Sequence, residues 1–107
     1  MAVALELDAA SERRLGKHAA TLIQVTREAL SNAARHGAAR TSRVSLRDGV
    51  GSVVLEVEDD GHGFKVQRVA RGQGLDNMRD RIEAIGGRLE IESDSAQGTR
   101  LDITIPG

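Results

Sequence analysis

Every β-like segment of this chain alternates apolar and polar residues, and this alternation most limits how the chain can fold. The opening segment places Val3, Leu5 and Leu7 on alternate positions, and the same period of two runs through SRVSLRD, SVVLEVED, RLEIESD and TRLDITIP. Strands buried on both faces would instead read as continuous apolar runs. We therefore predict an α/β two-layer sandwich, in which each strand buries one face and helices cover one side of the sheet.

Two helices are predicted between the alternating segments, and DAASER offers helix-start residues after the first. The first main helix runs from about Lys17 to Arg35, with Gly37 as its stop. Its apolar positions follow helical spacing: Ala19, Leu22, Ile23, Thr26, Leu30, Ala33 and Ala34. The second helix ends at Gly86 and Gly87 and is marked by these apolar residues: Leu75, Met78, Ile82 and Ile85.

The segments SRVSLRD and SVVLEVED are predicted to form a hairpin, as are RLEIESD and TRLDITIP. The first hairpin has Asp48-Gly49 and Gly51 between its strands. Because Val50 separates these glycines, we expect a turn longer than the minimal two residues.

Composition excludes several classes of function. The chain has 107 residues, enough for one domain over 1–107, and a formal net charge of −1. Phe64 is its only aromatic residue, so neither the charge nor the stacking surface of a nucleic-acid-binding protein is present. The absence of cysteine excludes disulfides and thiolate metal sites. Without a long apolar run we expect no direct membrane insertion and a cytoplasmic domain, which we interpret as a piece of a longer chain.

The first candidate site lies on the helix that contains VTREALSNAARHG. Glu28, Asn32, Arg35 and His36 share a face, and a helical wheel places the first three nearly opposite the Leu22–Thr26–Leu30–Ala33 stripe. A solvated helix face is one interpretation. Asparagine is a poor choice in mid-helix, however, and a side-chain carbonyl oxygen near a carboxylate suits Mg²⁺, which is the second interpretation.

Three glycine-containing stretches are further candidates. In EDDGHGF, Asp59 ends a strand, and Gly61 and Gly63 would let the backbone approach a ligand, although a simple turn has the same composition. In RGQGLDNMRDR, Gly72 and Gly74 immediately precede a helix, whose free N–H groups favour an anion. This stretch is neither a Walker loop nor a dinucleotide fingerprint. In AQGTRLDI, Gly98-Thr99 opens the last strand, where a hairpin turn would also suffice.

Taken in order, these four motifs resemble the Bergerat ATP-binding fold of histidine kinases, Hsp90, type II topoisomerases and MutL. The sequence is similar in four stretches to the catalytic domain of sensor histidine kinases of the nitrate-sensor and DesK type. These stretches are REALSNAARHG, VEDDGHGF, GQGLDNMRDRIEAIGGRLEIES and GTRLDITIP. The resemblance extends from about Ala19 to Pro106. It implies a mixed, mostly antiparallel sheet of about five strands, covered on one face by helices.

The resemblance also implies roles for individual residues, with ATP and Mg²⁺ as cofactors. Asn32 would coordinate Mg²⁺ on the ATP phosphates, and Glu28 would polarise the attacking nucleophile. Asp59 would accept a hydrogen bond from the adenine amino group, with Gly61 and Gly63 shaping that wall.

The remaining motif residues are expected to contact the nucleotide elsewhere. The motif G-x-G-L supplies Gly72, Gly74 and Leu75 at the phosphates, and Thr99 belongs to the Gly-Thr near the adenine wall. Arg35 and His36 stand where many histidine kinases have a lysine, and either could reach phosphate. The short segment between Gly63 and Gly72 is predicted to form a small mobile cap with three basic residues: Lys65, Arg68 and Arg71.

By this resemblance the chain is a histidine kinase domain that transfers the γ-phosphoryl of ATP to a histidine on a separate dimerisation module. A response regulator would act downstream, and we expect the isolated domain to be monomeric. We expect the dimerisation, phosphoacceptor and sensor domains to lie outside this sequence. Two alternatives remain: a serine kinase of the anti-sigma type with the same ATP pocket, and a module that binds nucleotide without transferring phosphate.

Overall fold

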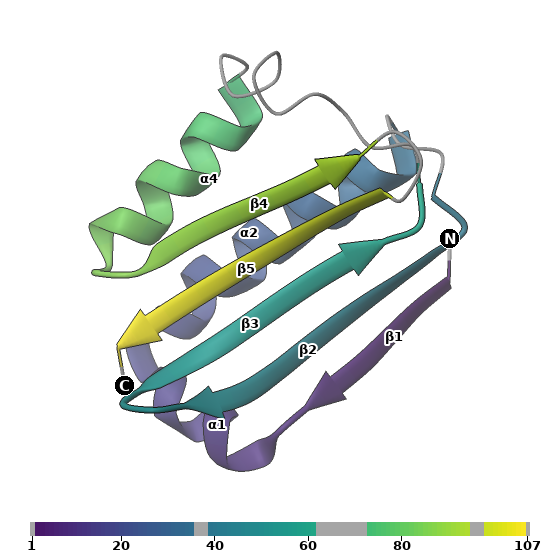
Figure 1. Ribbon diagram of the computed structural model, residues 1–107. Helices are drawn as coiled ribbons and strands as arrows, with labels where there is room; N and C mark the ends of the chain where they lie inside the picture. The colour runs from purple at the N-terminus through teal and green to yellow at the C-terminus, as the bar shows by residue number, and fades with distance from the viewer. Residues whose placement is uncertain (1, 36–38, 62–72, 95–97, 107) are drawn as a thin grey trace.

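The computed structural model describes residues 2–35, 39–61, 73–94 and 98–106, and its elements form two layers (Figure 1). The strands are β1 (Ala2–Leu7), β2 (Thr41–Gly49), β3 (Ser52–Asp59), β4 (Arg88–Asp94) and β5 (Gly98–Pro106). They form one sheet in the order β1-β2-β3-β5-β4. β1 runs parallel to β2 and the other neighbouring pairs are antiparallel, so the predicted mixed, mostly antiparallel sheet is confirmed.

The helices lie on one face of this sheet, as predicted (Figure 1). They are α1 (Ala9–Leu15), the short 3-10 helix η1 (Gly16–His18), α2 (Ala19–Arg35) and α4 (Gln73–Ala84). Asp8 caps α1, because its side chain accepts a hydrogen bond from the Ser11 amide at 2.9 Å. None of the helices in the described residues is long and apolar enough to cross a membrane.

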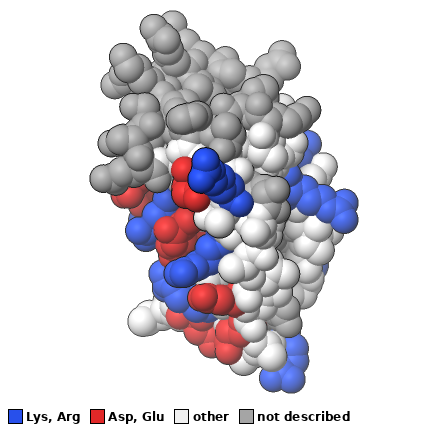
Figure 2. All heavy atoms as spheres, turned by 90° about the vertical axis from the view of Figure 1, so that its right-hand side faces the viewer, with Lys and Arg blue, Asp and Glu red and all other residues white. Residues whose placement is uncertain are grey.

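The other face of the sheet carries charged side chains. Arg100 and Arg47 lie 3.4 and 3.8 Å from the Glu56 carboxylate, and Arg43 lies 3.8 Å from Glu6. Burial, and next the hydrogen bond with Glu58, raises the pKa of Glu56. Figure 2 looks from the β1 side and shows acidic and basic side chains gathered together along one side of the molecule. The contrast between this charged face and the apolar one explains the alternation of the strands.

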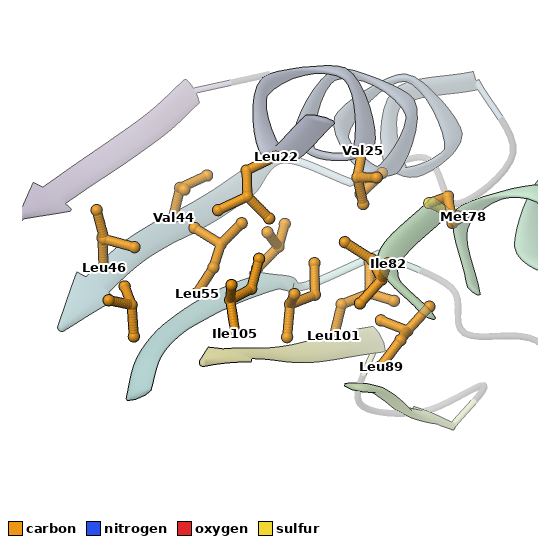
Figure 3. Close-up of a cluster of buried hydrophobic side chains, with 14 of the residues drawn as sticks. Leu22, Val25, Val44, Leu46, Leu55, Met78, Ile82, Leu89, Leu101 and Ile105 are labelled. Carbon is orange, nitrogen blue, oxygen red and sulfur yellow. The ribbon is translucent and has the colours of Figure 1, made fainter. Parts of the chain in front are cut away.

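The hydrophobic core lies between the sheet and the two long helices (Figure 3). Met78 and Ile82 of α4 are fully buried, as are Val25 of α2 and Ile103 and Ile105 of β5. α4 ends as predicted. Its last turn is closed by a bond of 2.9 Å from the Gly87 amide to the Ile82 carbonyl, with Gly86 at φ +80° between them.

The predicted turn of the first hairpin is wrong. Gly49 pairs with Ser52, so Val50 and Gly51 form a turn of only two residues. The reason is that Asp48-Gly49 continues the strand, with Asp48 opposite Val53, instead of forming the turn itself. Gly51 supplies a positive φ, +65°.

The prediction that β1 buries one face is also wrong. Val3, Leu5 and Leu7 are 42%, 63% and 46% exposed, although their register partners on β2 are buried. The alternation identified the strand correctly. It could not show that the described helices cover β2 and stop short of the edge strand beyond it.

Candidate functional site

The sheet brings two of the predicted site residues together. Asp59, the last residue of β3, pairs in register with Thr99, the second residue of β5. Gly98 precedes Thr99 at φ +94°, and a Cβ built there would overlap the Asp59 carbonyl oxygen and lie 3.2 Å from the Asp60 Cα. Only glycine therefore lets β5 begin directly against the Asp59-Asp60 backbone.

The carboxylate of Asp59 is held by its own loop. Its Oδ1 accepts a hydrogen bond of 2.9 Å from the amide of Gly61, the next glycine of the motif. Asp59 is half-buried and Gly61 is buried. The amide of Gly61 fixes the orientation of this carboxylate at the end of the sheet, so Gly61 does more than provide space.

The hydroxyl of Thr99 has a partner that the sequence analysis missed. Its Oγ1 lies 2.9 Å from the Oγ of Ser93, the residue opposite it on β4. The Ser93 hydroxyl also donates to the Gly98 carbonyl at 3.4 Å. Ser93 and Thr99 stand at matching positions near the turn of the second hairpin, and that symmetry was the available signal.

Asp60 was likewise missed, although it directly follows Asp59. Its Oδ1 accepts bonds of 2.9 Å from the Arg40 and Thr41 amides, and its Oδ2 accepts one of 2.9 Å from the Thr41 hydroxyl. The bonds from the Thr41 amide and hydroxyl, followed by that from Arg40, lower the pKa of the Asp60 carboxyl. Asp60 therefore fastens the end of β3 to the start of β2.

The C-terminal end of α2 is tied to the same place. The Ala39 amide donates to the Ala33 carbonyl at 3.1 Å, and Arg40, the next residue, bonds Asp60. Figure 1 shows that α2 ends at the edge of the sheet where β3 ends and β5 begins. Asn32, beside Ala33, thus lies at the end of the sheet that holds Asp59 and Thr99.

The predicted placement of Glu28 and Asn32 opposite the core stripe is wrong. The buried residues of α2 are Leu22, Val25, Ala29 and Ala33. With about 100° per residue, Asn32 lies about 65° and Glu28 about 105° from the centre of this buried face. Both are half-buried on its flank. The error arose because the predicted stripe contained Thr26 and Leu30, which are only half-buried, and left out Val25 and Ala29, which are buried. A flank position lets a side chain meet a ligand held beside the helix.

The boundary of α4 differs from the prediction. Gly72 and Gly74 were both predicted to precede the helix, but the helix begins at Gln73, so Gly74 belongs to its first turn. The first N–H groups of a helix have no intrahelical acceptor, so Gly74 still has the amide that the anion hypothesis requires.

Several predicted site residues fall outside the described part of the chain: His36, Gly63, Lys65, Arg68, Arg71 and Gly72. The side chains of Arg35 and Leu75 fall outside it as well. Their roles remain predictions. Within the ranges that the structure does describe, no three His, Cys, Asp or Glu side chains gather in a group that could hold a metal ion.

Comparison with known proteins defines the class. Residues 17–107 match the family described as histidine kinase-, DNA gyrase B-, and HSP90-like ATPase, and the chain belongs to this family. Its solved relatives include the ATP binding domain of PrrB from Mycobacterium tuberculosis, with a TM-score of 0.71 and 26% identity, over 82% of this chain and 68% of that one.

Within that family the chain is similar to sensor histidine kinases. It is 37% identical over 86 residues to sensor histidine kinase LiaS of Bacillus subtilis (strain 168), covering 79% of this chain and 24% of LiaS. It is 35% identical over 86 residues to sensor protein VraS of Staphylococcus haemolyticus (strain JCSC1435), covering 79% of this chain and 25% of VraS. The chain spans about a quarter of the length of these curated relatives.

Proposed function

We propose that this chain is the catalytic domain of a cytoplasmic histidine kinase module, which binds Mg-ATP for phosphorylation of a histidine on a separate dimerisation module. A response regulator would then receive the phosphoryl group. The observation that carries this proposal is that Asp59 and Thr99 pair at the same end of the sheet at which α2, the helix of Asn32, ends. This arrangement supports a site with one side for a base and another side for phosphates.

The adenine side of the proposed site rests on Asp59. Its carboxylate, oriented by the Gly61 amide, is half-buried and can accept a hydrogen bond from an exocyclic amino group. A bond of this kind to a charged acceptor contributes roughly 1.5–3 kcal/mol. The Thr99 hydroxyl lies on the neighbouring strand and offers a second polar contact.

The phosphate side rests on α2. The Asn32 side-chain oxygen is a hard ligand of the kind Mg²⁺ takes, and Mg²⁺ when bound supplies charge neutralisation at the phosphates. Glu28, one turn earlier on the same flank, orients the acceptor imidazole and accepts its proton. We assign phosphate contacts to the Gly72 and Gly74 amides and to Arg35 or His36, by their positions in the motifs.

Substitutions at the two acids separate binding from transfer. Asp59→Ala should weaken ADP binding about ten- to a hundredfold, whereas Asp59→Asn keeps an accepting oxygen and should cost less. Glu28→Gln should leave ADP affinity within about threefold while transfer to the parent's dimerisation module falls about 10²-fold or more. Calorimetry and labelling with γ-labelled ATP measure the two effects.

Glu83→Gln is the matched control, because Glu83 is an exposed helical glutamate on α4 and should change neither quantity. If Glu28→Gln lost ADP binding while Asp59→Ala bound ADP normally, the assignment of the adenine end to Asp59 and of the phosphate end to α2 would be wrong. Label found on serine of an added substrate, and not on histidine, would favour the anti-sigma type of kinase. The absence of nucleotide binding by a folded chain would refute the proposal.

A further inference from the structure

The outer edge of β1 combines two features that usually do not coexist on a soluble domain. Val3, Leu5 and Leu7 point to the helix side of the sheet, since they pair in register with three buried residues of β2, and yet they are 42–63% exposed. In the part of the chain that the structure describes, no strand lies beyond β1. The molecule turns this side to the viewer in Figure 2, where uncharged residues cover much of the described surface.

The backbone of β1 adds a second feature. The amides of Ala2 and Asp8 donate to the Arg40 and Leu46 carbonyls of the β2 segment at 3.0 and 3.1 Å. In a parallel pair, alternate residues bond a given neighbour, so the even-numbered residues of β1 face β2. The N–H and C=O groups of Val3, Leu5 and Leu7 therefore point outward. An edge with apolar side chains and outward polar groups is a template for adding a strand.

We propose that the added strand is β1 of a second copy of this chain, antiparallel, with the two-fold axis at Leu5. In this register Leu5 faces the partner's Leu5, and Val3 faces the partner's Leu7. Each of these pairs joins residues whose polar groups point outward, so they form the hydrogen-bonded pairs of an antiparallel ladder. All the apolar side chains then lie together on the helix side of a sheet continuous through both copies.

Charge selects this register among the possible ones. It places Glu6 on the charged face, opposite the partner's Ala4. A shift by one pair toward the C-terminus would set Glu6 against the partner's Glu6, and like charges directly opposite each other are unfavourable. The opposite shift would leave Leu7 facing position 1, outside the strand. Only the register centred on Leu5 pairs the apolar residues completely and keeps the carboxylates apart, which is why a second copy fits this edge.

The contact is small, and its strength follows from its size. Six residues of strand bury less than the roughly 1,000 Å² that a stable interface needs, so we expect a dissociation constant on the order of 100 μM. At low micromolar concentration we then expect the isolated domain to be monomeric, and at millimolar concentration we expect a dimer.

Single cysteines test the register directly, because the natural chain has none. Residues of a hydrogen-bonded pair have Cα atoms about 5.5 Å apart, within the disulfide range, so Leu5→Cys should cross-link to its copy. The two Glu6 positions are offset along the strands and lie about 8 Å apart, too far for a disulfide. Glu6→Cys is the matched control, since Leu5 and Glu6 are adjacent and both exposed.

We expect Leu5→Cys to form a disulfide dimer about tenfold faster than Glu6→Cys at about 200 μM protein in an oxidising buffer. Sedimentation equilibrium should show the wild type dimerising, with association weakened about tenfold or more in Leu5→Lys. Val50→Lys, at the exposed β2–β3 turn, should associate like the wild type. Thermal unfolding of each variant establishes that it is folded.

The proposal is overturned by a wild type that stays monomeric to about 1 mM, which would leave this edge to another protein. It is equally overturned if Leu5→Cys and Glu6→Cys cross-link at the same rate, or if folded Leu5→Lys associates like the wild type. None of these measurements depends on nucleotide, so their failure and that of the proposed function are distinguishable.

Discussion

Gly98→Ala should damage both the stability and the nucleotide site, and the structure allows the two causes to be separated. At φ +94° an alanine is strained by roughly 1 kcal/mol. Its Cβ would also overlap the Asp59 carbonyl oxygen and lie 3.0 Å from the Asp59 carbonyl carbon. Because both neighbouring atoms belong to backbone, the strand end must move, which costs roughly a further 1–3 kcal/mol. The total loss is about 2–4 kcal/mol.

Gly86→Ala supplies the matched control. Gly86 has a similar positive φ, +80°, but a Cβ there meets nothing within 4 Å. This variant should therefore lose only the strain, about 1 kcal/mol. Urea unfolding measures both free energies, and the difference between the variants isolates the contact with Asp59. At about 4 °C per kcal/mol, the melting temperature should fall about 8–16 °C for Gly98→Ala and about 4 °C for Gly86→Ala.

The same pair of variants tests the connection to the proposed site. Moving the Asp59 backbone moves its carboxylate, so ADP affinity should fall about tenfold in Gly98→Ala and stay unchanged in Gly86→Ala. Equal losses of unfolding free energy in the two variants would refute the role given to the Gly98 contact. Normal ADP affinity in a destabilised Gly98→Ala would show that Asp59 does not hold the base.

The remaining predictions concern protonation, packing and the metal. Because the pKa of Asp60 is lowered in the folded state, its carboxylate stabilises the fold at pH values above the ordinary pKa of 3.8, and this stabilisation is lost as the pH falls through the folded pKa. In Asp60→Asn, the midpoint of urea unfolding should therefore fall less steeply as the pH is lowered. Ile82→Ala should cost about 2–5 kcal/mol in urea unfolding, whereas the half-exposed Ile23→Ala should cost about 0.5 kcal/mol. EDTA should weaken ATP binding in calorimetry more than ADP binding, and this difference should disappear in Asn32→Ala.

Segments whose pattern carries its own end signals could be predicted from the sequence. β4 and β5 alternate over their whole length and pair with each other, as expected for adjacent segments. α4 combines apolar residues at helical spacing with the Gly86-Gly87 pair that closes its last turn. In both cases local chemistry and tertiary packing favour the same secondary structure, so the sequence pattern is sufficient to predict it.

Burial that depends on a distant neighbour could not be predicted. β1 and β3 have the same alternation, but of these two strands only β3 is covered by helices. The apolar residues of β1 stay exposed. The orientation of α2 failed for a related reason. Its apolar residues span a wide arc that includes Ile23 and Leu30, and packing on the sheet selects the part centred between Val25 and Ala33.

The site divides in the same way. Asp59 and Thr99 could be selected as candidates because they belong to motifs whose order resembles a known family, and the register of β3 and β5 brings them together. Asp60 and Ser93 were missed because their side chains bond partners that are not their sequence neighbours. A bond from Asp60 to Thr41 spans 19 residues, and no local pattern reveals it.

Asp59 and Asp60 show how two adjacent identical residues acquire different roles. The Asp59 carboxylate bonds its own loop at Gly61, whereas the Asp60 carboxylate bonds Arg40 and Thr41 across the sheet end. The segment that begins at Ala39 is in turn bonded to the last turn of α2. The position of Asn32 relative to Asp59 therefore depends on the bonds of Asp60, a residue outside the proposed contacts. A nucleotide held at both ends needs one separation of these groups, and the three hydrogen bonds to the Asp60 carboxylate maintain the frame that sets this separation.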